Sequence, residues 1–533
     1  MPTSPARPVL PAQLTRQRVG VLIPLFSVRT DADMGVGEIL DLIPFIDWMA
    51  AQGFSVLQLL PLNECSPSET SPYQSLSSFA IDPVYLSLDG GLALENRRAF
   101  EEGLEASDIQ AQVRRLRDSP RVCYEEIRVL KNDLFQAAFE KFKQEEWDRG
   151  SDRAAAFKVY IEQKSVWLED YVLFRLLKEK YHWSHWRSWP EAFQKREPEA
   201  LSLLREADAD RILFFQFLQW TAWEQWHRVR RHAAALDVLL MGDMPFLISD
   251  DSADVWSDQA SFRADISVGA PPDDFSATGQ DWGLPFFDWD VMKGNDFKWW
   301  RSRIAEASQT FDILRLDHVV GFFRVWIIEK DQPPRFEPGP EAEQLARGNT
   351  LLNIVIEEAG ATIPIAEDLG VIPDFVRQRL SALSIAGMKV LRWEKDGTHY
   401  RDPNAYPFVS LATTGTHDTT PLVIWWETAS WEDKRGFLEM LGAADALSPD
   451  SPFDERLHEK ILDRLLGSGA GLVTLPIQDL FAQRDRINTP ATVGADNWRY
   501  RLPLSLSALE TTSPYKEKLV VLKTLIARHH RVR

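Results

Sequence analysis

Three acidic residues stand where they could act together in catalysis. Asp317, Glu367 and Asp418 each follow a short apolar run of the kind that forms a strand. The intervals between them are 50 residues (367 minus 317) and 51 residues (418 minus 367), which fits one or two strand–helix units each. In a parallel barrel the carboxyl ends of the strands meet on one face, so these side chains would converge there. Paired carboxyl groups are what glycosidic bond cleavage requires, and a sugar-cleaving site is therefore the first hypothesis.

The neighbours of these acids favour the same chemistry. Arg315 lies two residues before Asp317, on the same side of the strand, and can hold that carboxylate ionised through a charge-assisted contact. Retaining glycosyl transfer needs a carboxylate nucleophile and a second carboxyl group that acts as acid and then as base. Glu367 has the longer side chain, suited to reaching a leaving oxygen. His417 supplies a hydrogen-bond donor beside Asp418, which could grip sugar hydroxyls.

Each of these residues also has a structural explanation when it is considered alone. An Asp after a strand often caps the next helix, and this alternative stays open for Asp418 and for Asp243. His417 could be a loop histidine with satisfied hydrogen bonds. The acidic run at 250–258 lacks the spacing and the glycine of a calcium loop, so we expect a helix start with a solvated acidic face and no metal.

The elements that must position these residues alternate between strands and helices. Helical patterns at 38–51 and 375–383 lie between short apolar runs, which is the alternation of a parallel barrel. The number of such runs favours a closed (β/α)8 barrel over an open sheet. The runs predicted as strands are 19–23, 54–60, 238–242, 311–316, 361–366, 388–393, 408–414 and 471–475.

Two long intervals between the predicted strands indicate insertions into a single catalytic domain that spans 1–533. Residues 90–235 carry charge-rich sequence with helical periodicity, so we expect a mostly helical insertion. Residues 244–310 are rich in Asp, Pro and Gly and should form loops over the barrel mouth, a candidate substrate lid. Only 58 residues (533 minus 475) follow the last predicted strand, which is too few for an added β domain.

Composition narrows the class of partner. The formal net charge of −19 argues against nucleic acid and anionic membranes, because both select basic surfaces. Cys65 and Cys123 are too few for a disulfide framework, and no Cys/His cluster has zinc spacing. The start of the chain lacks a secretory h-region, and no apolar run approaches the length of a membrane span. We therefore expect a cytoplasmic protein that needs no obligate protein partner.

A series of motifs, in order along nearly the whole chain, resembles glycoside hydrolase family 77, the 4-alpha-glucanotransferases or amylomaltases, which are relatives of the α-amylases. Two positions depart from common forms of the family: Asp82 precedes Pro83 where Asn is frequent, and 419–421 (TTP) replaces an Asn-containing run. The motifs are 71–75 (SPYQS) with Phe79 and Ala80, 242–245 (GDMP), 251–256 (DSADVW), 271–283 (PPDDFSATGQDWG), 315–318 (RLDH), 366–370 (AEDLG), 415–418 (GTHD), 475–479 (LPIQD) and 497–499 (NWR).

The resemblance implies a fold and an activity. It implies a (β/α)8 barrel with inserted subdomains, no separate C-terminal β domain, and transfer of α-1,4-glucan segments between chains without a cofactor. The substrates would be maltooligosaccharides and other α-1,4-glucans, with glucose as an acceptor, and we expect short maltooligosaccharides to be the natural ones.

The resemblance also implies roles for individual residues. Asp317 would be the nucleophile, Glu367 the general acid and base, and Asp418 the transition-state stabiliser. Substrate-binding residues would be Arg315, His417, Asp243, Tyr73, Gln280 and Trp282.

Two other functions stay open from the sequence. An α-1,4-glucan hydrolase would use the same three carboxylates with water as the acceptor. A catalytically silent glucan-binding protein is the alternative from another class, and the intact carboxylates with Arg315 speak against it.

Overall fold

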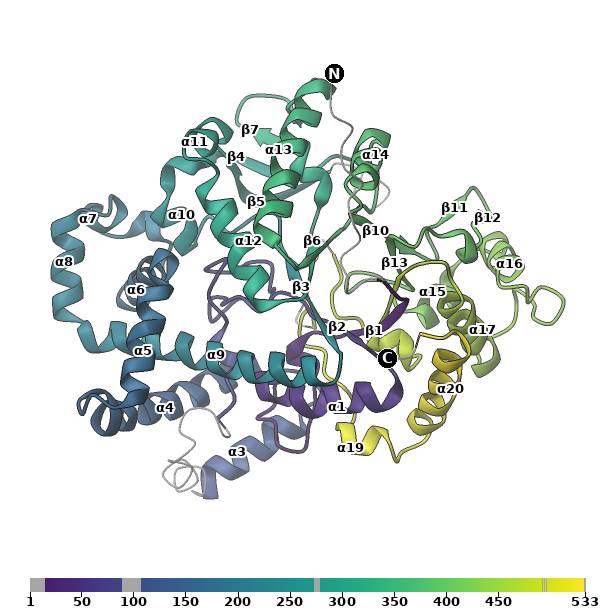
Figure 1. The fold of residues 1–533 in the computed structure, drawn as a ribbon, viewed down its shortest axis with the longest axis horizontal. Coiled ribbons are helices and arrows are strands. Elements are labelled where there is room, and N and C mark those ends of the chain that lie inside the picture. The colour runs from purple at the N-terminus through teal and green to yellow at the C-terminus, as the bar shows by residue number, and fades with distance from the viewer. Residues whose placement is uncertain are drawn as a thin grey trace.

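The chain folds around a closed barrel of eight parallel strands in this computed structural model (Figure 1). The structure describes residues 15–88, 107–272, 279–490, 492, 494 and 496–531. Around the barrel the strand order is β1-β14-β13-β10-β9-β6-β3-β2, and β2 pairs with β1 to close the ring. The barrel strands are β1 (Arg18–Leu22), β2 (Val56–Gln58), β3 (Leu239–Met244), β6 (Ile313–Leu316), β9 (Ile363–Ala366), β10 (Ala386–Val390), β13 (Ser410–Thr413) and β14 (Leu472–Pro476).

These strands confirm the fold class expected from the sequence. Each of the eight predicted apolar runs overlaps one barrel strand, because alternate side chains fill the barrel interior, such as Leu239 and Met241 of β3. The boundaries differ at the run predicted for 388–393. There β10 ends at Val390, because the chain turns out of the barrel and the N–H of Trp393 donates to the carbonyl of Val390 at 2.8 Å.

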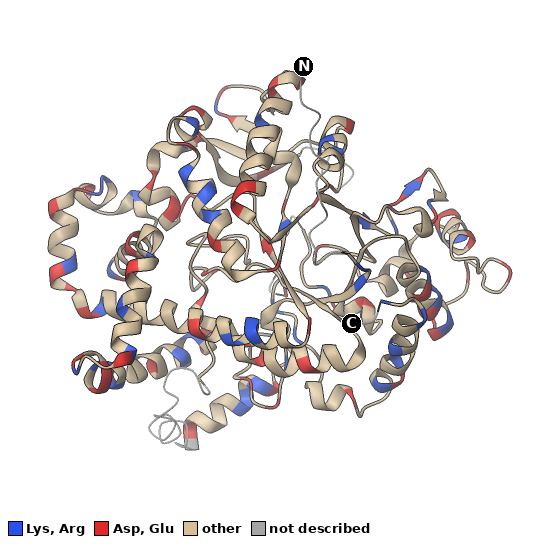
Figure 2. Ribbon diagram, viewed as in Figure 1, with Lys and Arg blue, Asp and Glu red and all other residues tan. Residues whose placement is uncertain are grey.

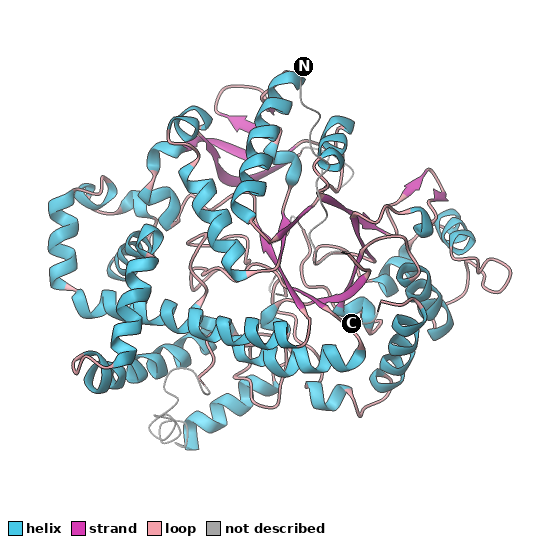
Figure 3. Ribbon diagram, viewed as in Figure 1, coloured by secondary structure: helices cyan, strands magenta, loops and turns pink. Residues whose placement is uncertain are grey.

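Helices cover the outside of the ring of strands (Figure 3). They connect the carboxyl end of one strand to the start of the next, as parallel pairing requires. Short 3-10 turns η2 (Leu25–Ser27) and η3 (Ile39–Asp41) lead from β1 to the first of them. The outer helices are α1 (Leu42–Gln52), α12 (Lys298–Thr310), α13 (Glu341–Ala359), α14 (Asp374–Ala382), α15 (Leu422–Thr428), α16 (Trp431–Met440) and α17 (Glu455–Leu466).

The described residues between β2 and β3 are mainly helical and form the left part of the view in Figure 1. Residues 90–106 of the insertion predicted there lie outside the described part of the chain. The 27-residue α9 leads into β3. Its Trp220 and Trp226 side chains are buried and pack in the core. The elements are η4 (Pro83–Tyr85), α3 (Ser107–Asp118), α4 (Tyr124–Phe142), the π-helix η5 (Lys143–Trp147), α5 (Asp152–Gln163), α6 (Ser165–Lys180), η6 (Trp186–Ser188), α7 (Glu191–Gln194), α8 (Pro198–Ala207) and α9 (Ala209–Ala235).

A second sheet lies beside the barrel mouth and was not predicted. Its four strands are antiparallel in the order β5-β4-β7-β8 (Figure 3). The expectation that 244–310 forms only loops was therefore wrong. β4 and β5 alternate apolar residues with polar, Gly or Pro residues, as at 262–270 (FRADISVGA), so neither contains the continuous apolar run by which the barrel strands were predicted. The second sheet draws its strands from both sides of β6 in the sequence. The sheet and the short elements next to it are α10 (Ala253–Ser257), η7 (Gln259–Ser261), β4 (Phe262–Ala270), β5 (Gln280–Phe287), α11 (Trp289–Gly294), η8 (Val319–Phe322), β7 (Val325–Glu329) and β8 (Arg335–Glu337).

After β14 the described residues form helices and irregular segments, not the strands of an added β domain. The last helix is α20, which packs beside α17 (Figure 1). A two-stranded ribbon joins β10 to β13 on the same side of the molecule. The remaining elements are β11 (Lys395–Asp396), β12 (His399–Tyr400), η9 (Pro403–Ala405), α18 (Ile477–Leu480), α19 (Leu506–Leu509) and α20 (Tyr515–Arg528).

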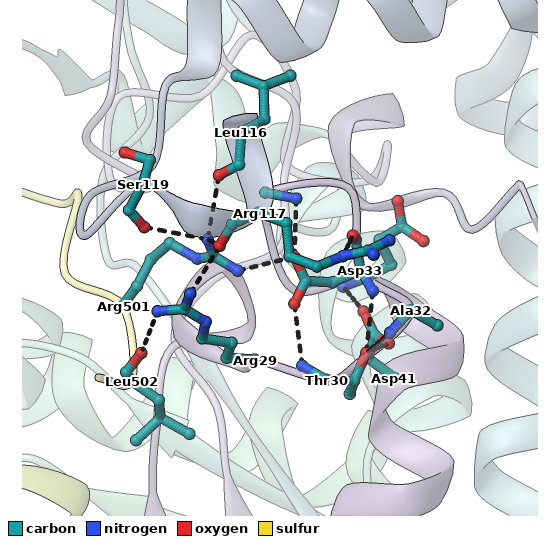
Figure 4. Close-up of polar contacts among 12 residues, drawn as sticks. Arg29, Thr30, Ala32, Asp33, Asp41, Leu116, Arg117, Ser119, Arg501 and Leu502 are labelled. Atoms are coloured by element: carbon teal, nitrogen blue, oxygen red, sulfur yellow. Dashed lines mark hydrogen bonds and ion pairs between the residues drawn. The ribbon is translucent and has the colours of Figure 1, made fainter. Parts of the chain in front are cut away.

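A buried polar network ties the loop after β1 to the C-terminal segment (Figure 4). Arg501 Nη2 donates to Asp33 Oδ1 at 2.7 Å, and both side chains are 0% exposed. Asp33 Oδ2 also accepts the N–H of Thr30 at 2.9 Å, while Arg501 Nη1 donates to the carbonyl of Arg117 at 2.8 Å. Segments that are far apart in sequence are thereby fixed to one another next to the barrel.

The surface carries interspersed charges of both signs, and Figure 2 shows acidic and basic residues alternating along the outer helices. Acidic residues prevail, in keeping with the net charge of −19. No helix within the described residues is long and apolar enough to cross a membrane.

Candidate active site

Asp243, Asp317 and Glu367 lie at the carboxyl ends of β3, β6 and β9, which are neighbours in the barrel. Asp243 lies in β3 and is paired with Arg315 of β6 in the strand register. Asp317 follows β6 directly, and its N–H donates to the carbonyl of Met244 at 3.1 Å. Glu367 follows β9, and its N–H donates to the carbonyl of Leu316 at 3.0 Å. The sheet therefore brings these side chains to one face of the barrel, as the spacing in the sequence predicts.

Arg315 joins two carboxylates at this face. Its Nη1 donates to both oxygens of Asp243, at 2.7 and 2.8 Å, and lies 2.8 Å from Asp317 Oδ1. Burial disfavours the charge on Arg315, but the carboxylates of Asp243 and Asp317 outweigh it and raise its pKa, so the guanidinium stays charged. Asp317 remains 25% exposed, whereas Asp243 is buried. Arg315 thus holds Asp317 in place while its carboxylate stays partly exposed.

Glu367 is fixed by the backbone next to Asp317. Its Oε2 accepts the N–H of His318 at 2.9 Å, and its Oε1 accepts the N–H of Leu369 at 3.2 Å. Burial raises the pKa of Glu367 to about 8; the positive charge of Arg315 acts in the opposite direction and the negative charge of Asp317 adds to the rise. At neutral pH this carboxyl group is therefore largely protonated and can serve as a general acid.

Asp418 lies in the loop after β13 and has the opposite ionisation. Its Oδ2 is 3.4 Å from His417 Nε2, and its Oδ1 accepts a hydrogen bond from Asn488 Nδ2 at 2.7 Å. Burial alone would raise the pKa of Asp418, but His417 and the Asn488 hydrogen bond outweigh it and lower the pKa to about 2. The reciprocal attraction of Asp418 raises the pKa of His417 against the effect of burial. The site therefore contains one protonated carboxyl group, that of Glu367, and an ionised one, that of Asp418.

Tyr73 connects the Asp243 side of the site with the His417 side. Its hydroxyl donates to Asp243 Oδ2 at 2.7 Å. Its ring stacks on His417 with ring centres 5.2 Å apart and planes inclined by 19°, and Trp498 packs against both rings. The ring of Tyr73, a predicted substrate-binding residue, is thus partly covered by His417 and Trp498.

Trp282 and Gln280 reach the site from the second sheet. Both belong to β5, and the ring of Trp282 meets that of His318 edge to face at 5.3 Å. Gln280 Oε1 accepts a hydrogen bond from Trp282 Nε1 at 3.3 Å. Gln280 thus contacts Trp282, and Trp282 in turn contacts His318 of the barrel. Burial lowers the pKa of His318 to about 4, which keeps this imidazole neutral at physiological pH. Residues 273–278 of the same motif lie outside the described part of the chain.

Residues without an assigned role in the sequence analysis support the Asp418 loop (residues 414–422). Asp479, from the segment after β14, accepts hydrogen bonds from Thr414 Oγ1 at 2.6 Å and from the N–H of Leu422 at 2.7 Å. Arg392, from the turn after β10, donates to the carbonyl of Thr414 at 3.0 Å. Asp479 belongs to the motif 475–479 (LPIQD), which was the only feature of the sequence that pointed to these supporting residues. None of the motifs contains Arg392.

The acidic run at 250–258 is engaged by other groups of the protein and Asp254 is buried, so the expectation of a solvated acidic face was wrong there. Asp250 pairs with Arg187, Asp251 with Lys178, and Asp254 accepts hydrogen bonds from Trp299 Nε1 and the N–H of Ser78. Across the described ranges, no group of three or more His, Cys, Asp or Glu side chains has a geometry that could hold a metal ion. The run begins α10, whose N-cap is Ser252.

The sequence profile of the 4-alpha-glucanotransferases, glycoside hydrolase family 77, matches residues 23–507. The chain belongs to the 4-alpha-glucanotransferase family. Two curated relatives of that name are those of Chlamydia pneumoniae, 34% identical over 511 residues that cover 93% of each chain, and of Thermus thermophilus, 32% identical over 475 residues that cover 86% of this chain and 89% of the other. This 4-alpha-glucanotransferase is therefore an enzyme of carbohydrate metabolism.

Solved structures agree with the barrel. The amylomaltase from Streptococcus agalactiae in complex with acarbose superposes with a TM-score of 0.81 at 26% sequence identity, covering 97% of this chain and 100% of that one. The amylomaltase from Corynebacterium glutamicum shares the fold, with a TM-score of 0.79 at 20% identity, covering 96% of this chain and 76% of that one. The chain therefore has the fold of these amylomaltases.

Proposed function

We propose that this enzyme transfers α-1,4-glucan segments by a retaining double displacement, from a maltooligosaccharide or longer glucan to the 4-hydroxyl of glucose or another glucan. The observation that carries this proposal is the contrast between two neighbouring carboxyl groups. Glu367 has a pKa raised to about 8, while Asp317 is partly exposed and lies 2.8 Å from the guanidinium of Arg315, which orients it for attack. One group can give a proton while the other attacks carbon.

In the first half-reaction, Asp317 attacks the anomeric carbon of the donor sugar. The glycosidic C–O bond breaks, and Glu367 gives its proton to the departing 4-hydroxyl oxygen. A covalent ester between Asp317 and the glucan results. Asp418, ionised with a pKa of about 2, accepts hydrogen bonds from sugar hydroxyls, which strengthen as the ring flattens toward the oxocarbenium-like transition state.

In the second half-reaction, the ionised Glu367 takes the proton of the acceptor 4-hydroxyl. The freed oxygen attacks the same anomeric carbon, the ester bond breaks, and Asp317 leaves as a carboxylate. Two inversions give net retention. Because Glu367 regains its proton, the enzyme returns to its starting state without any cofactor.

Neutral maltooligosaccharides fit the character of the cleft. Trp282 is only partly buried and offers an aromatic ring beside His318, while Asp243, Arg315 and His417 carry hydrogen-bonding groups at the barrel end of the site. The acarbose complex of the similar S. agalactiae amylomaltase supports an oligosaccharide ligand. We further propose that the whole chain acts as one catalytic domain, with 90–235 as a flanking helical insertion and 244–310 bordering the mouth through Trp282.

Maltotriose as sole substrate tests this proposal. Transfer yields glucose together with products longer than maltotriose, whereas hydrolysis yields only shorter sugars, and a silent binding protein yields neither. Chromatography of the products over time distinguishes the three outcomes. The Asp317→Asn variant is the matched control, since an amide cannot form the glycosyl ester and should lower the rate by several orders of magnitude. Products no longer than the substrate would contradict the transfer reaction.

A further inference from the structure

The Asp418 loop is held at both ends by buried groups. Asp479, 2% exposed, accepts from Thr414 at the start of the loop and from Leu422 at its end. Arg392, 3% exposed, donates to the carbonyls of Thr414 at 3.0 Å and Thr420 at 2.5 Å. These contacts fix the path of the loop but do not reach the carboxylate of Asp418.

The segment after β14 (residues 479–488) reaches Asp418 itself. Arg486 Nη2 donates to the carbonyl of Asp418 at 2.7 Å, and its Nη1 donates to Thr420 Oγ1 at 3.1 Å. The third nitrogen, Nε, donates to the carbonyl of Asn488 at 3.0 Å. One guanidinium therefore joins the backbone that carries Asp418 to the backbone that carries Asn488.

Asn488 completes this connection at the carboxylate. Its Nδ2 donates to Asp418 Oδ1 at 2.7 Å, and the residue is only 9% exposed. An ionised carboxylate only accepts hydrogen bonds, so the amide must present its NH2 group. His417 Nε2 faces the other oxygen at 3.4 Å. The carboxylate is thus gripped on both oxygens by groups from two different segments.

We propose that Asn488 and Arg486 are positioning residues for glucan transfer: Asn488 fixes the orientation of the Asp418 carboxylate and holds it as an anion, and Arg486 fixes the backbone between them. This inference rests on the proposed role of Asp418 in the transition state. An anion that must not rotate or take up a proton gains from a donor of fixed direction, because preorganised groups need no rearrangement during the reaction.

Several charged or titratable groups surround Asp418 besides Asn488. His417 comes from its own loop, Arg315 from β6, Arg486 from the segment after β14 and Tyr73 from the loop after β2. His417 and Arg315 favour the ionised carboxylate, and Asn488 adds to them through its hydrogen bond. The side chain of Asn488 carries no charge and does not titrate. Replacing it therefore changes the orientation and the ionisation of Asp418 without removing a charge from the site.

Two substitutions separate positioning from simple packing. Asn488→Leu keeps the volume and removes the donor, so kcat should fall about tenfold with KM changed less than twofold, since one charge-assisted hydrogen bond is lost in the transition state. Asn488→Asp introduces a carboxyl group that donates to Asp418 when protonated and repels it when ionised. The proximity of Asp418 raises the pKa of the introduced group.

The decisive readout is the ratio of variant to wild-type kcat on maltotriose between pH 5 and pH 8. For Asn488→Asp this ratio should fall at least about tenfold as the pH rises, because protons are lost from the introduced group, whereas for Asn488→Leu it should stay constant. The matched control is Asn132→Asp on the exposed face of α4, whose ratio should stay near one. A flat or rising ratio for Asn488→Asp, or a wild-type kcat for Asn488→Leu, overturns the inference.

Two further variants keep the outcomes distinct. If Asp418→Ala retains wild-type kcat, the proposed role of Asp418 fails, and the inference fails with it. If Asp418→Ala is inactive and the Asn488 variants behave like wild type, only the inference fails. Should Asn488→Leu not fold, as judged by its thermal unfolding, Asn488→Ser takes its place: its shorter hydroxyl cannot reach Oδ1, and the same loss of kcat is expected.

Discussion

The carboxylate oxygen Oε2 of Glu367 accepts the backbone N–H of His318 at a distance of 2.9 Å. His318 directly follows Asp317, the proposed nucleophile, and adopts a left-handed backbone conformation with φ of 49°. A backbone donor cannot rotate away as a side chain can. The proposed acid and the proposed nucleophile are therefore set relative to one another by a single peptide unit.

The first prediction concerns the basic limb of the pH profile. Because the raised pKa of Glu367 is about 8, its proton is present at neutral pH and is lost as the pH rises through that value. The value of kcat/KM for maltotriose should therefore fall above about pH 8. With an α-glucosyl fluoride donor, whose leaving group needs little protonation, the first step should not show this fall. A decline centred near pH 5 for maltotriose would contradict the assignment.

The second prediction concerns Trp282, whose ring lies edge to face with His318 at the rim of the site. Trp282→Ala should raise the proportion of hydrolysis to transfer on maltotriose, because a sugar acceptor loses a stacking surface that water does not use. Product analysis measures the ratio. Trp431→Ala, at the start of α16 and 48% exposed, is the matched control and should leave the ratio unchanged. An unaltered ratio for Trp282→Ala would place this ring outside the acceptor path.

The third prediction concerns the buried pair of Asp33 and Arg501 (Figure 4). Arg501→Met leaves the Asp33 carboxylate buried without its partner and should lower the free energy of unfolding by about 3–5 kcal/mol. The thermal unfolding midpoint measures this. Lys195→Met is the control: its pair with Glu191 is highly exposed and screened by water, so its loss should leave the unfolding midpoint close to that of the wild type. Adding Asp33→Leu to Arg501→Met should recover part of the stability; equal midpoints for Arg501→Met and wild type would argue that the pair is not buried in solution.

The barrel could be predicted from the sequence because its strands are short, buried and mainly apolar. Every residue of β1 is buried, so burial on both faces leaves a continuous apolar signal in a run such as 19–23 (VGVLI). The candidate carboxylates Asp317 and Glu367 could be found in the sequence because each is an acidic residue that directly follows a predicted apolar strand. The second sheet left no such signal, because half of its faces are exposed and β4 has an irregular register.

The supports of Asp418 could not be predicted from the sequence alone. Asn488 and Asp418 are 70 residues apart and meet through loops, where neither helical nor strand periodicity applies. Arg486 and Asn488 lie in a polar stretch in which nothing distinguishes a buried donor from a solvated one. Only the folded chain, in which β13 and β14 are neighbours, brings the two loops together.

The covalent intermediate is the most direct test of the mechanism, and Glu367→Gln allows it to be trapped. An α-glucosyl fluoride donor should still react with Asp317 in this variant, because fluoride departs without a general acid, but no base remains to activate an acceptor. Intact-protein mass spectrometry should show one added glycosyl group, peptide mapping should locate it on Asp317, and the additional change Asp317→Asn should abolish it. An adduct on Asp418, or an inverted anomeric configuration in the wild-type product, would contradict the mechanism.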